Sequence, residues 1–223
     1  SSAAASELTF NKIDTNKLLK ANGLPIASSR VVNRQQLPSD RHREVLSLGL
    51  PVVTKPPRQG SSVGISIVTA EQQIETALLL AFEYDELCLV ESFIAGREIT
   101  VPVIDGHAFP PIEIRPAEAW YDYQAKYQDD RTQYIVAPND IPSDISELAV
   151  AACRICNVTG IARVDFRIDN DNNPWILEVN TVPGMTSHSL VPKSAGHLQL
   201  SLSEVCELAI RNRLEKTNND NAG

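Results

Sequence analysis

Residues 161–180 read IARVDFRIDNDNNPWILEVN, a pattern in which polar and apolar side chains alternate on either side of an Asn/Asp cluster. Such alternation predicts two paired strands, and Asn170–Asn173 are the expected turn because Asn and Asp tolerate left-handed backbone. In this hairpin Asp165 lies opposite Glu178 and Arg163 opposite Asn180. The other face carries the expected apolar pairs, Val164 with Val179 and Phe166 with Leu177.

The polar face of this hairpin predicts a divalent-metal site. Facing carboxylates on neighbouring strands repel unless they are protonated or bridged by a cation. Asp165, Glu178 and Asn180 all offer oxygen ligands, which Mg²⁺ prefers, and nucleotide phosphates commonly complete its coordination. The alternative is a solvated polar face of an amphipathic hairpin, which the hairpin taken by itself favours. The rest of the chain favours the metal and nucleotide site.

A lysine and a flexible loop precede the hairpin by about a hundred residues. Lys55 ends an apolar strand expected at residues 50–55, and residues 56–64, PPRQGSSVG, form a loop. Its amides and hydroxyls are suited to phosphate, although it is not a Walker A loop and such runs more often simply turn the chain.

The pattern along the whole chain favours an α+β architecture over a doubly wound parallel sheet. Strands are expected at 50–55, 65–68, 87–93, 98–104 and 107–114, the last two joined by the hairpin dipeptide Asp105-Gly106. Helices are expected at 11–21, 40–48 and 143–156, at 74–82 after a Thr69/Gln72 capping box, and after a second capping box at Ser201/Glu204. Residues 115–138 are aperiodic and are expected to form a functional loop.

Composition excludes several classes of protein. The chain has 20 basic and 28 acidic residues, a net charge of -8, which disfavours nucleic-acid binding, and no apolar run long enough to span a membrane. Its four cysteines suggest a reducing cytoplasm. Cys153 and Cys156 have helical spacing, which favours core packing over redox or zinc chemistry. The first residues do not resemble a secretory signal and suggest a cut end.

Several motifs together resemble the D-alanine-D-alanine ligases of the ATP-grasp superfamily, over about residues 3–212. They are Lys55 with RQGSSVG (58–64), LVE (89–91), GRE (96–98), YDYQAKY (121–127), RVD (163–165), LEVN (177–180) and TVPGMTSHSLVP (181–192). The resemblance implies an ATP-grasp fold of two α+β subdomains with ATP between them. These are residues 1–94, with a phosphate loop (56–64) and an adenine strand (87–94), and residues 95–216, with an ω-loop (116–138) and the metal hairpin (161–180). Residues 217–223 are an expected disordered tail.

The resemblance also implies the nucleotide contacts. Lys12, Lys55 and Ser62 would hold phosphates, with Lys126 reaching the γ-phosphate. Glu91 and the main chain of Ser92, Phe93 and Ile94 would line the adenine, and Glu98 would take the ribose hydroxyls. Asp165 and Glu178 would bind one Mg²⁺ or Mn²⁺ ion, and Glu178 and Asn180 a second.

The implied reaction joins two D-alanines for peptidoglycan synthesis in a bacterial cytoplasm. One D-alanine carboxylate attacks the γ-phosphate of ATP, and the amine of a second displaces phosphate from the acyl phosphate. Arg163 would offset the anionic charge, and the Gly184 amide would serve as an oxyanion donor, although Pro-Gly is also an ordinary turn. Tyr127 would hydrogen-bond Ser61 and close the ω-loop. Ser189 and Leu190 would hold the carboxylate of the second D-alanine.

One departure from the family leaves three readings open. Family members carry an amino-terminal domain of about 90 to 100 residues, a common size for a small domain, and nothing here corresponds to it. That domain helps to orient the first D-alanine and contributes to dimer contacts, so a homodimer is an expectation for the full-length form. The chain is therefore interpreted as a D-alanine-D-alanine ligase, as a nucleotide-binding fragment inactive without that domain, or as a ligase for another D-amino acid or D-hydroxy acid.

Overall fold

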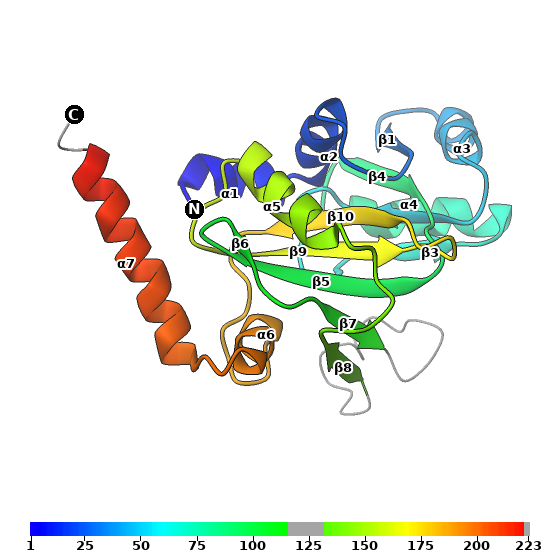
Figure 1. The fold of residues 1–223 in the computed structure, drawn as a ribbon. Coiled ribbons are helices and arrows are strands. Elements are labelled where there is room, and N and C mark those ends of the chain that lie inside the picture. The colour runs from blue at the N-terminus through cyan, green and yellow to red at the C-terminus, as the bar shows by residue number, and fades with distance from the viewer. Residues whose placement is uncertain (116–131, 221–223) are drawn as a thin grey trace.

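The computed structural model describes residues 1–115 and 132–220, which contain two antiparallel sheets (Figure 1). The smaller sheet has the order β1-β4-β2-β3, and the larger has β10-β9-β5-β7-β8 with β6 on β5. Every strand pair in these described ranges is antiparallel, which confirms the α+β prediction. The strands are β1 (Ser29–Asn33), β2 (Val52–Lys55), β3 (Ser66–Val68), β4 (Leu87–Ser92), β5 (Arg97–Ile104), β6 (His107–Ala108), β7 (Ile112–Arg115), β8 (Gln133–Val136), β9 (Ile161–Ile168) and β10 (Pro174–Asn180).

The helices divide between the two sheets. They are α1 (Ala3–Phe10), α2 (Lys12–Ala21), α3 (Pro38–Leu46), the 3-10 turn η1 (Glu71–Gln73), α4 (Ile74–Phe82), α5 (Ile145–Ile155), α6 (Leu190–His197) and α7 (Leu202–Asp220). Helices α3 and α4 cover the smaller sheet, whereas α5 packs against β5 and β9. Helix α7 extends away from both sheets (Figure 1).

Each sheet has its own hydrophobic core. Val52, Leu78 and Phe82 belong to the core of the smaller sheet, whereas Val164 and Phe166 belong to that of the larger one. Helices α1 and α2 contact β10, and α2 contributes Leu19 to the larger core. The strands of the two sheets are thus separate in sequence, ending at Ser92 in one and starting at Arg97 in the other, whereas the two helices at the start of the chain contact the larger sheet.

The CxxC segment is part of the larger core, as predicted. Cys153 and Cys156 are both buried there, and burial raises the pKa of the two thiols to about 12 and about 11. A thiol with such a pKa stays protonated at neutral pH, which is the state expected of a packing side chain.

Several sequence predictions were wrong in detail. Residues 107–114 form two short strands, not one, because Pro110 and Pro111 interrupt the ladder. The capping glutamine is Gln73, whose Oε1 accepts the Thr69 and Ala70 N–H groups, rather than Gln72. Helix α7 continues to Asp220, where a disordered tail from Thr217 was expected. Helices α1 and α6, and strand β8 inside the expected ω-loop, were not predicted.

The crossover between the sheets, residues 93–96, requires glycine at its end. Gly96 has φ +131, and a Cβ built there would lie 2.0 Å from the backbone oxygen of Ile168 on β9. A backbone atom cannot move aside as a flexible side chain can. The backbone of the crossover therefore lies so close to β9 that only glycine fits at position 96.

We expect Gly96→Ala to lower the free energy of unfolding by about 2 kcal/mol or more, because it combines a steric clash with an unfavourable φ. Gly196→Ala in α6 is the matched control, since nothing lies within 4 Å of its Cβ position. Alanine within a helix is expected to be neutral or stabilising by up to about 1 kcal/mol. Urea denaturation measures both changes, and equal stabilities of the two variants would contradict the prediction.

Candidate nucleotide and metal site

The hairpin of β9 and β10 presents the predicted polar face. Asp165 pairs with Glu178 and Arg163 with Asn180, as the sequence indicated. The predicted pair of Phe166 with Leu177 is wrong, because a bulge between Ile176 and Glu178 sets Phe166 opposite Ile176 instead. The extra residue of a bulge shifts the apolar register by one position without moving the polar pairs. The two carboxylates therefore still face each other.

Arg163 and Thr100 donate hydrogen bonds to Asp165. The Arg163 guanidinium donates from Nε to Oδ1 and from Nη2 to Oδ2, both at 2.8 Å, and the Thr100 hydroxyl on β5 donates to Oδ1 at 2.6 Å. Thr100 is fully buried, so its contact fixes the carboxylate from the neighbouring strand. Sequence reasoning missed Thr100, which only the pairing of β5 with β9 brings to the site.

Glu178 is paired with a lysine from the start of the chain. The Nζ atom of Lys12, the first residue of α2, lies 3.4 Å from Glu178 Oε2, and it also donates to the carbonyl of Gln59. Burial and, to a smaller extent, the positive charge of Lys55 lower the pKa of Lys12, whereas Glu178 and Glu91 oppose that shift. Lys12 therefore connects the metal hairpin with loop 56–64.

The second predicted phosphate lysine is part of the same charged cluster. Lys55 at the end of β2 forms an ion pair of 2.5 Å with Glu91 on β4, and both side chains are buried. Asn16 of α2 donates to the other carboxylate oxygen of Glu91 at 2.7 Å. The smaller sheet thus contributes a lysine and a carboxylate beside Lys12, which lies near the carboxylates of the larger sheet.

The predicted adenine segment is only partly available to a ligand. The N–H groups of Ser92 and Phe93 donate to the carbonyls of Ser28 and Pro51, so they do not point to a ligand. The carbonyl of Ile94 accepts from Arg167 Nε at 3.1 Å. Glu98, the predicted ribose ligand, pairs across the strands with Arg167. Arg167 was not among the predicted site residues.

Loop 56–64 approaches Lys12 through its backbone, since the Lys12 N–H donates to the Pro57 carbonyl. Ser61 and Ser62 have φ of 47 and 58 in this loop, a left-handed conformation that is uncommon for serine. Both predicted contacts are therefore on a tightly turned segment near the lysine. The other two predicted loop contacts, Lys126 and Tyr127, lie outside the described residues.

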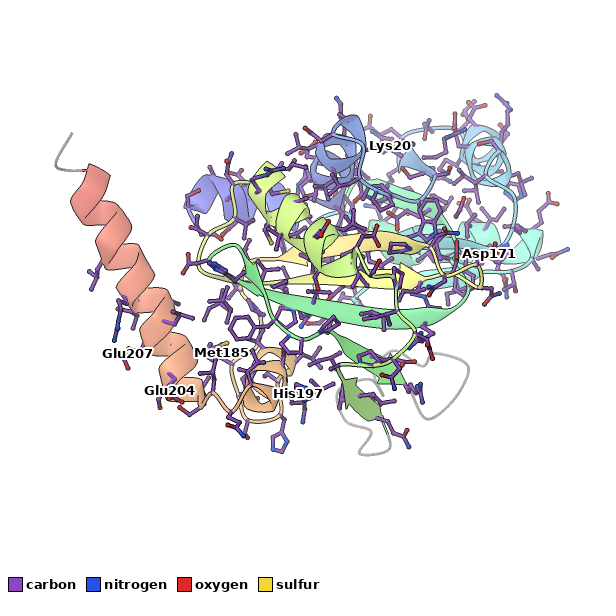
Figure 2. All side chains as sticks on the ribbon, viewed as in Figure 1. Lys20, Asp171, Met185, His197, Glu204 and Glu207 are labelled. Atoms are coloured by element: carbon purple, nitrogen blue, oxygen red, sulfur yellow. The ribbon has the colours of Figure 1, made fainter. Side chains whose placement is uncertain are left out.

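Gly184 and Ser189, predicted for different roles, are neighbours in space. A Cβ at Gly184 would lie 2.7 Å from Ser189 Oγ, so a larger residue there would displace the Ser189 hydroxyl. Ser189 Oγ accepts from the Thr186 N–H at 3.1 Å. Ser189 is the N-cap residue of α6, without a capping hydrogen bond from its side chain, and Leu190 is the first residue of the helix. Met185, labelled in Figure 2, packs against the hydrophobic cluster that contains Val191 and Ala195 of α6. A helix N-terminus favours anions, in keeping with a substrate carboxylate.

The predicted metal donors fit a site that a substrate would complete. In the described parts of the chain, no group of three or more His, Cys, Asp and Glu side chains is arranged to hold a metal. Asp165, Glu178 and Asn180 provide two carboxylates and an amide, all oxygen donors suited to Mg²⁺. The carboxylates are at present balanced by Arg163 and Lys12. An ion held here would need further ligands, such as nucleotide phosphates.

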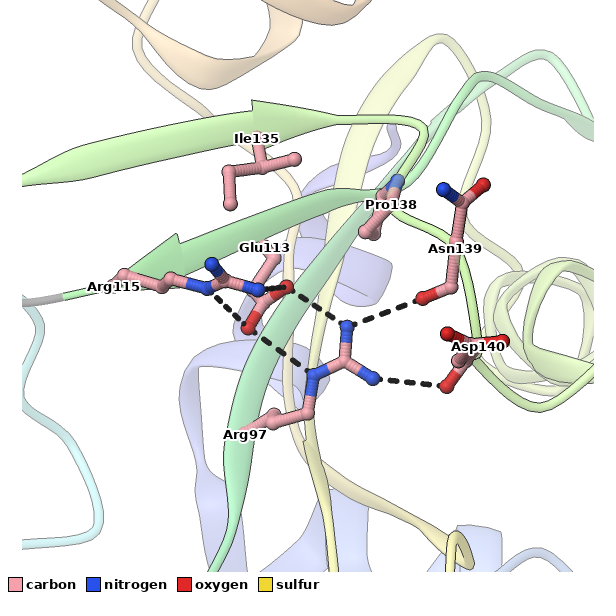
Figure 3. Close-up of a pocket in the computed structure, with 7 residues that line it drawn as sticks. All are labelled: Arg97, Glu113, Arg115, Ile135, Pro138, Asn139 and Asp140. Atoms are coloured by element: carbon pink, nitrogen blue, oxygen red, sulfur yellow. Dashed lines mark hydrogen bonds and ion pairs between the residues drawn. The ribbon is translucent and has the colours of Figure 1, made fainter.

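A separate pocket lies on the other face of the larger sheet. Its volume is about 350 Å³, and Figure 3 shows Arg97, Glu113, Arg115, Ile135, Pro138, Asn139 and Asp140 around it. Arg97 and Arg115 each donate two hydrogen bonds to Glu113, and Arg97 also donates to the carbonyl of Asp140. The charges of this pocket are thus paired with one another, which indicates a structural ion-pair network tying β5 and β7 to the segment before α5.

We expect Glu113 to stabilise the fold above pH 4.5 and to lose that effect on acidification. The two guanidinium groups lower the pKa of Glu113 from 4.5 to about 2. A lowered pKa means that the folded state prefers the ionised form, so the contribution is complete above pH 4.5 and fades as the pH falls toward about 2. Glu113→Gln should lower Tm by about 4 °C at pH 7, with the difference shrinking below pH 4.5.

Calorimetry of the two proteins from pH 7 to pH 2.5 measures this difference. Glu204→Gln is the comparison, because Glu204 is held mainly by the local contact with Ser201. A difference between wild type and Glu113→Gln that does not depend on pH would contradict the assignment.

Two antiparallel sheets, with Lys55 and loop 56–64 at the smaller one, a hairpin of facing carboxylates on the larger one and Lys12 between them, fit the ATP-grasp class of fold. Comparison with known proteins gives the family. The family described as D-ala D-ala ligase C-terminus matches residues 18–210. The D-alanine--D-alanine ligase of Haemophilus ducreyi is 40% identical over 205 residues, covering 91% of this chain and 67% of that protein. The chain belongs to the D-alanine--D-alanine ligase family.

Solved structures agree with this assignment. The D-alanine--D-alanine ligase from Bacillus anthracis has a TM-score of 0.85 and 32% identity, covering 99% of this chain and 72% of that chain. The same enzyme complexed with ATP has a TM-score of 0.82 and 26% identity, covering 99% and 71%. The chain spans about two thirds of the length of the Haemophilus ducreyi relative. In the described residues, no helix is long and apolar enough to cross a membrane.

Proposed function

We propose that the chain binds ATP, with two Mg²⁺ or Mn²⁺ ions, between its two α+β subdomains and ligates two D-alanines into D-alanyl-D-alanine for peptidoglycan synthesis. The observation that carries the proposal is the convergence at Lys12. Its ammonium contacts Glu178 of the larger sheet and the carbonyl of Gln59 in loop 56–64. Family membership supports the reaction type.

The phosphates of ATP are assigned to the two buried lysines and loop 56–64. Lys12 and Lys55 are now balanced by Glu178 and Glu91. A polyphosphate offers these ammonium groups a stronger anionic partner, and the lowered pKa of Lys12 would rise beside it. Ser62 of the loop and Lys126 would add contacts. Glu91 and the crossover, including Ile94, would receive the adenine, and Glu98 the ribose.

Divalent ions bound by Asp165, Glu178 and Asn180 would neutralise phosphate charge during transfer. The Arg163 guanidinium, which holds Asp165 by two hydrogen bonds, would also offset charge on the transferred group. The first D-alanine carboxylate would attack the γ-phosphate and give an acyl phosphate and ADP. This step develops negative charge on oxygen, so a fixed cation stabilises the transition state.

The second step requires an amine and a place for its carboxylate. We assign that carboxylate to Ser189 and Leu190 at the N-terminus of α6, where helix amides and the Ser189 hydroxyl favour an anion. The free amine of this D-alanine would attack the acyl phosphate, and the Gly184 amide would stabilise the oxyanion before phosphate leaves. Ser61 with Tyr127 would close the site and exclude the water that hydrolyses acyl phosphates.

The proposal is tested by incubating the 223-residue chain with ATP, Mg²⁺ and D-alanine and measuring phosphate and dipeptide. Equal amounts of phosphate and D-alanyl-D-alanine are expected. ATP binding by calorimetry without turnover would instead favour the second candidate, a nucleotide-binding unit that depends on residues outside this chain. This candidate is retained because the chain matches only about two thirds of the length of the Haemophilus ducreyi relative. Product only with D-serine or D-lactate would contradict D-alanine as the acceptor.

Glu178→Gln is expected to weaken Mg²⁺-ATP binding at least tenfold and to abolish dipeptide formation, because the amide cannot supply the charge that a bridging ligand needs. The matched control is Glu147→Gln, the same change at an exposed position of α5, which should bind and turn over as wild type does. Calorimetry with Mn²⁺ in place of Mg²⁺ tests whether the loss of ATP affinity in Glu178→Gln depends on the ion that is bound. Wild-type binding and activity in Glu178→Gln would overturn the metal assignment.

A further inference from the structure

Arg167 lies on the polar face of β9, two residues beyond Asp165. The alternation along β9 buries Phe166 and Ile168 and leaves Arg163, Asp165 and Arg167 on the opposite face. The Arg167 side chain is only 15% exposed. A guanidinium that is mostly shielded from solvent needs hydrogen-bond or ion-pair partners in the protein.

The guanidinium of Arg167 reaches the crossover between the sheets. Its Nε donates to the carbonyl of Ile94 at 3.1 Å, and its Cζ lies 5.8 Å from the centre of the Phe93 ring. A hydrogen bond and a cation–π contact from one side chain fix the backbone and the ring of two consecutive residues. The segment held in this way is the one to which the proposed function assigns the adenine.

The same guanidinium also lies beside the carboxylate assigned to the ribose. Glu98 and Arg167 are cross-strand partners on β5 and β9, and Nη1 of Arg167 lies 3.9 Å from Oε2 of Glu98. This separation is within ion-pair reach but too long for a hydrogen bond. Opposite charges at directly paired positions attract each other, so the Arg167 guanidinium helps to orient the Glu98 carboxylate.

Only arginine can make both contacts at once. The Nε–H and Nη1–H groups lie in one rigid plane and point in different directions within it, so one side chain contacts the Ile94 carbonyl and the Glu98 carboxylate together. A lysine has a single ammonium group and would reach one of the two.

We infer that Arg167 is a positioning residue of the nucleotide site, which orients Glu98 and the crossover and thereby sets the preference for a nucleotide with a 2′-hydroxyl group. This inference rests on the proposed function, because it takes Glu98 as the ribose ligand. Arg167 would act through Glu98, which is assigned to the sugar, and through Ile94, which is assigned to the base.

The experiment is calorimetric titration of the 223-residue chain with Mg²⁺-ATP and with Mg²⁺-2′-deoxyATP. Wild type should bind ATP more tightly than the deoxynucleotide. Arg167→Met should weaken ATP binding about tenfold, the effect of losing one charge-assisted hydrogen bond, and should bring the two affinities closer together. In a Glu98→Gln background the preference should already be reduced, and Arg167→Met should reduce it no further.

The matched control is Arg97→Met, which removes an arginine from the neighbouring strand on the opposite face of the sheet. Arg97 contacts Glu113 and the carbonyl of Asp140, so its loss should lower Tm and leave the preference for ATP over 2′-deoxyATP unchanged. A purely structural role of Arg167 would give the same result as Arg97→Met. That outcome would overturn the inference.

Two further outcomes are separable. If wild type binds neither nucleotide, the proposed function fails and the inference fails with it. If wild type binds and prefers ATP while Arg167→Met keeps both affinities, the inference alone is overturned. Should Arg167→Met not fold, Arg167→Lys is measured in its place, and at least threefold weaker ATP binding is expected because the fork is lost. Wild-type affinity and preference in Arg167→Lys would contradict the requirement for two contacts.

Discussion

The two facing carboxylates of Asp165 and Glu178 are the constraint on which the rest of the site depends. The two carboxylates lie side by side on paired strands and repel each other, and each of them is paired with a cation. Arg163 binds Asp165 from the same strand, and Lys12 approaches Glu178 from helix α2. The need for this second cation explains why a buried lysine, with its pKa lowered by burial, stands at the start of a helix far away in sequence.

That pairing also connects the two halves of the fold. Helix α2 contributes Leu19 to the core of the larger sheet, yet Lys12 and Asn16 at its other end contact loop 56–64 and Glu91 of the smaller sheet. The crossover at residues 93–96 is the covalent connection, and Gly96 lets it run against the backbone of β9. Arg167 adds a side-chain connection at the same place. The nucleotide site proposed for this family member lies along these connections.

The pocket around Glu113 shows how charge is used elsewhere on the same sheet. There a buried carboxylate is paired with two arginines, and its pKa is strongly lowered. Charges in that pocket neutralise one another, whereas each pair of the Lys12 cluster joins a cation to a group that the proposed function assigns to ATP or metal. Arg97 and Glu98 are consecutive residues of β5 and face opposite sides of the sheet. Arg97 belongs to the ion-pair network on one face, and Glu98 belongs to the proposed nucleotide site on the other.

The sequence by itself determined the α+β class, the hairpin, the facing of Asp165 with Glu178 and the burial of Cys153 and Cys156, because period-two alternation and helical spacing are local properties. It also carried the family motifs. Only the tertiary structure decided that Thr100 holds Asp165, that Lys12 neutralises Glu178 and that Arg167 binds the Ile94 carbonyl. These contacts join residues 65 to 166 positions apart, through strand order and helix packing that no local pattern encodes. The bulge at Leu177 and helix α6 likewise follow from how neighbouring elements pack, whereas the split at Pro110 and Pro111 is a local effect of the two prolines.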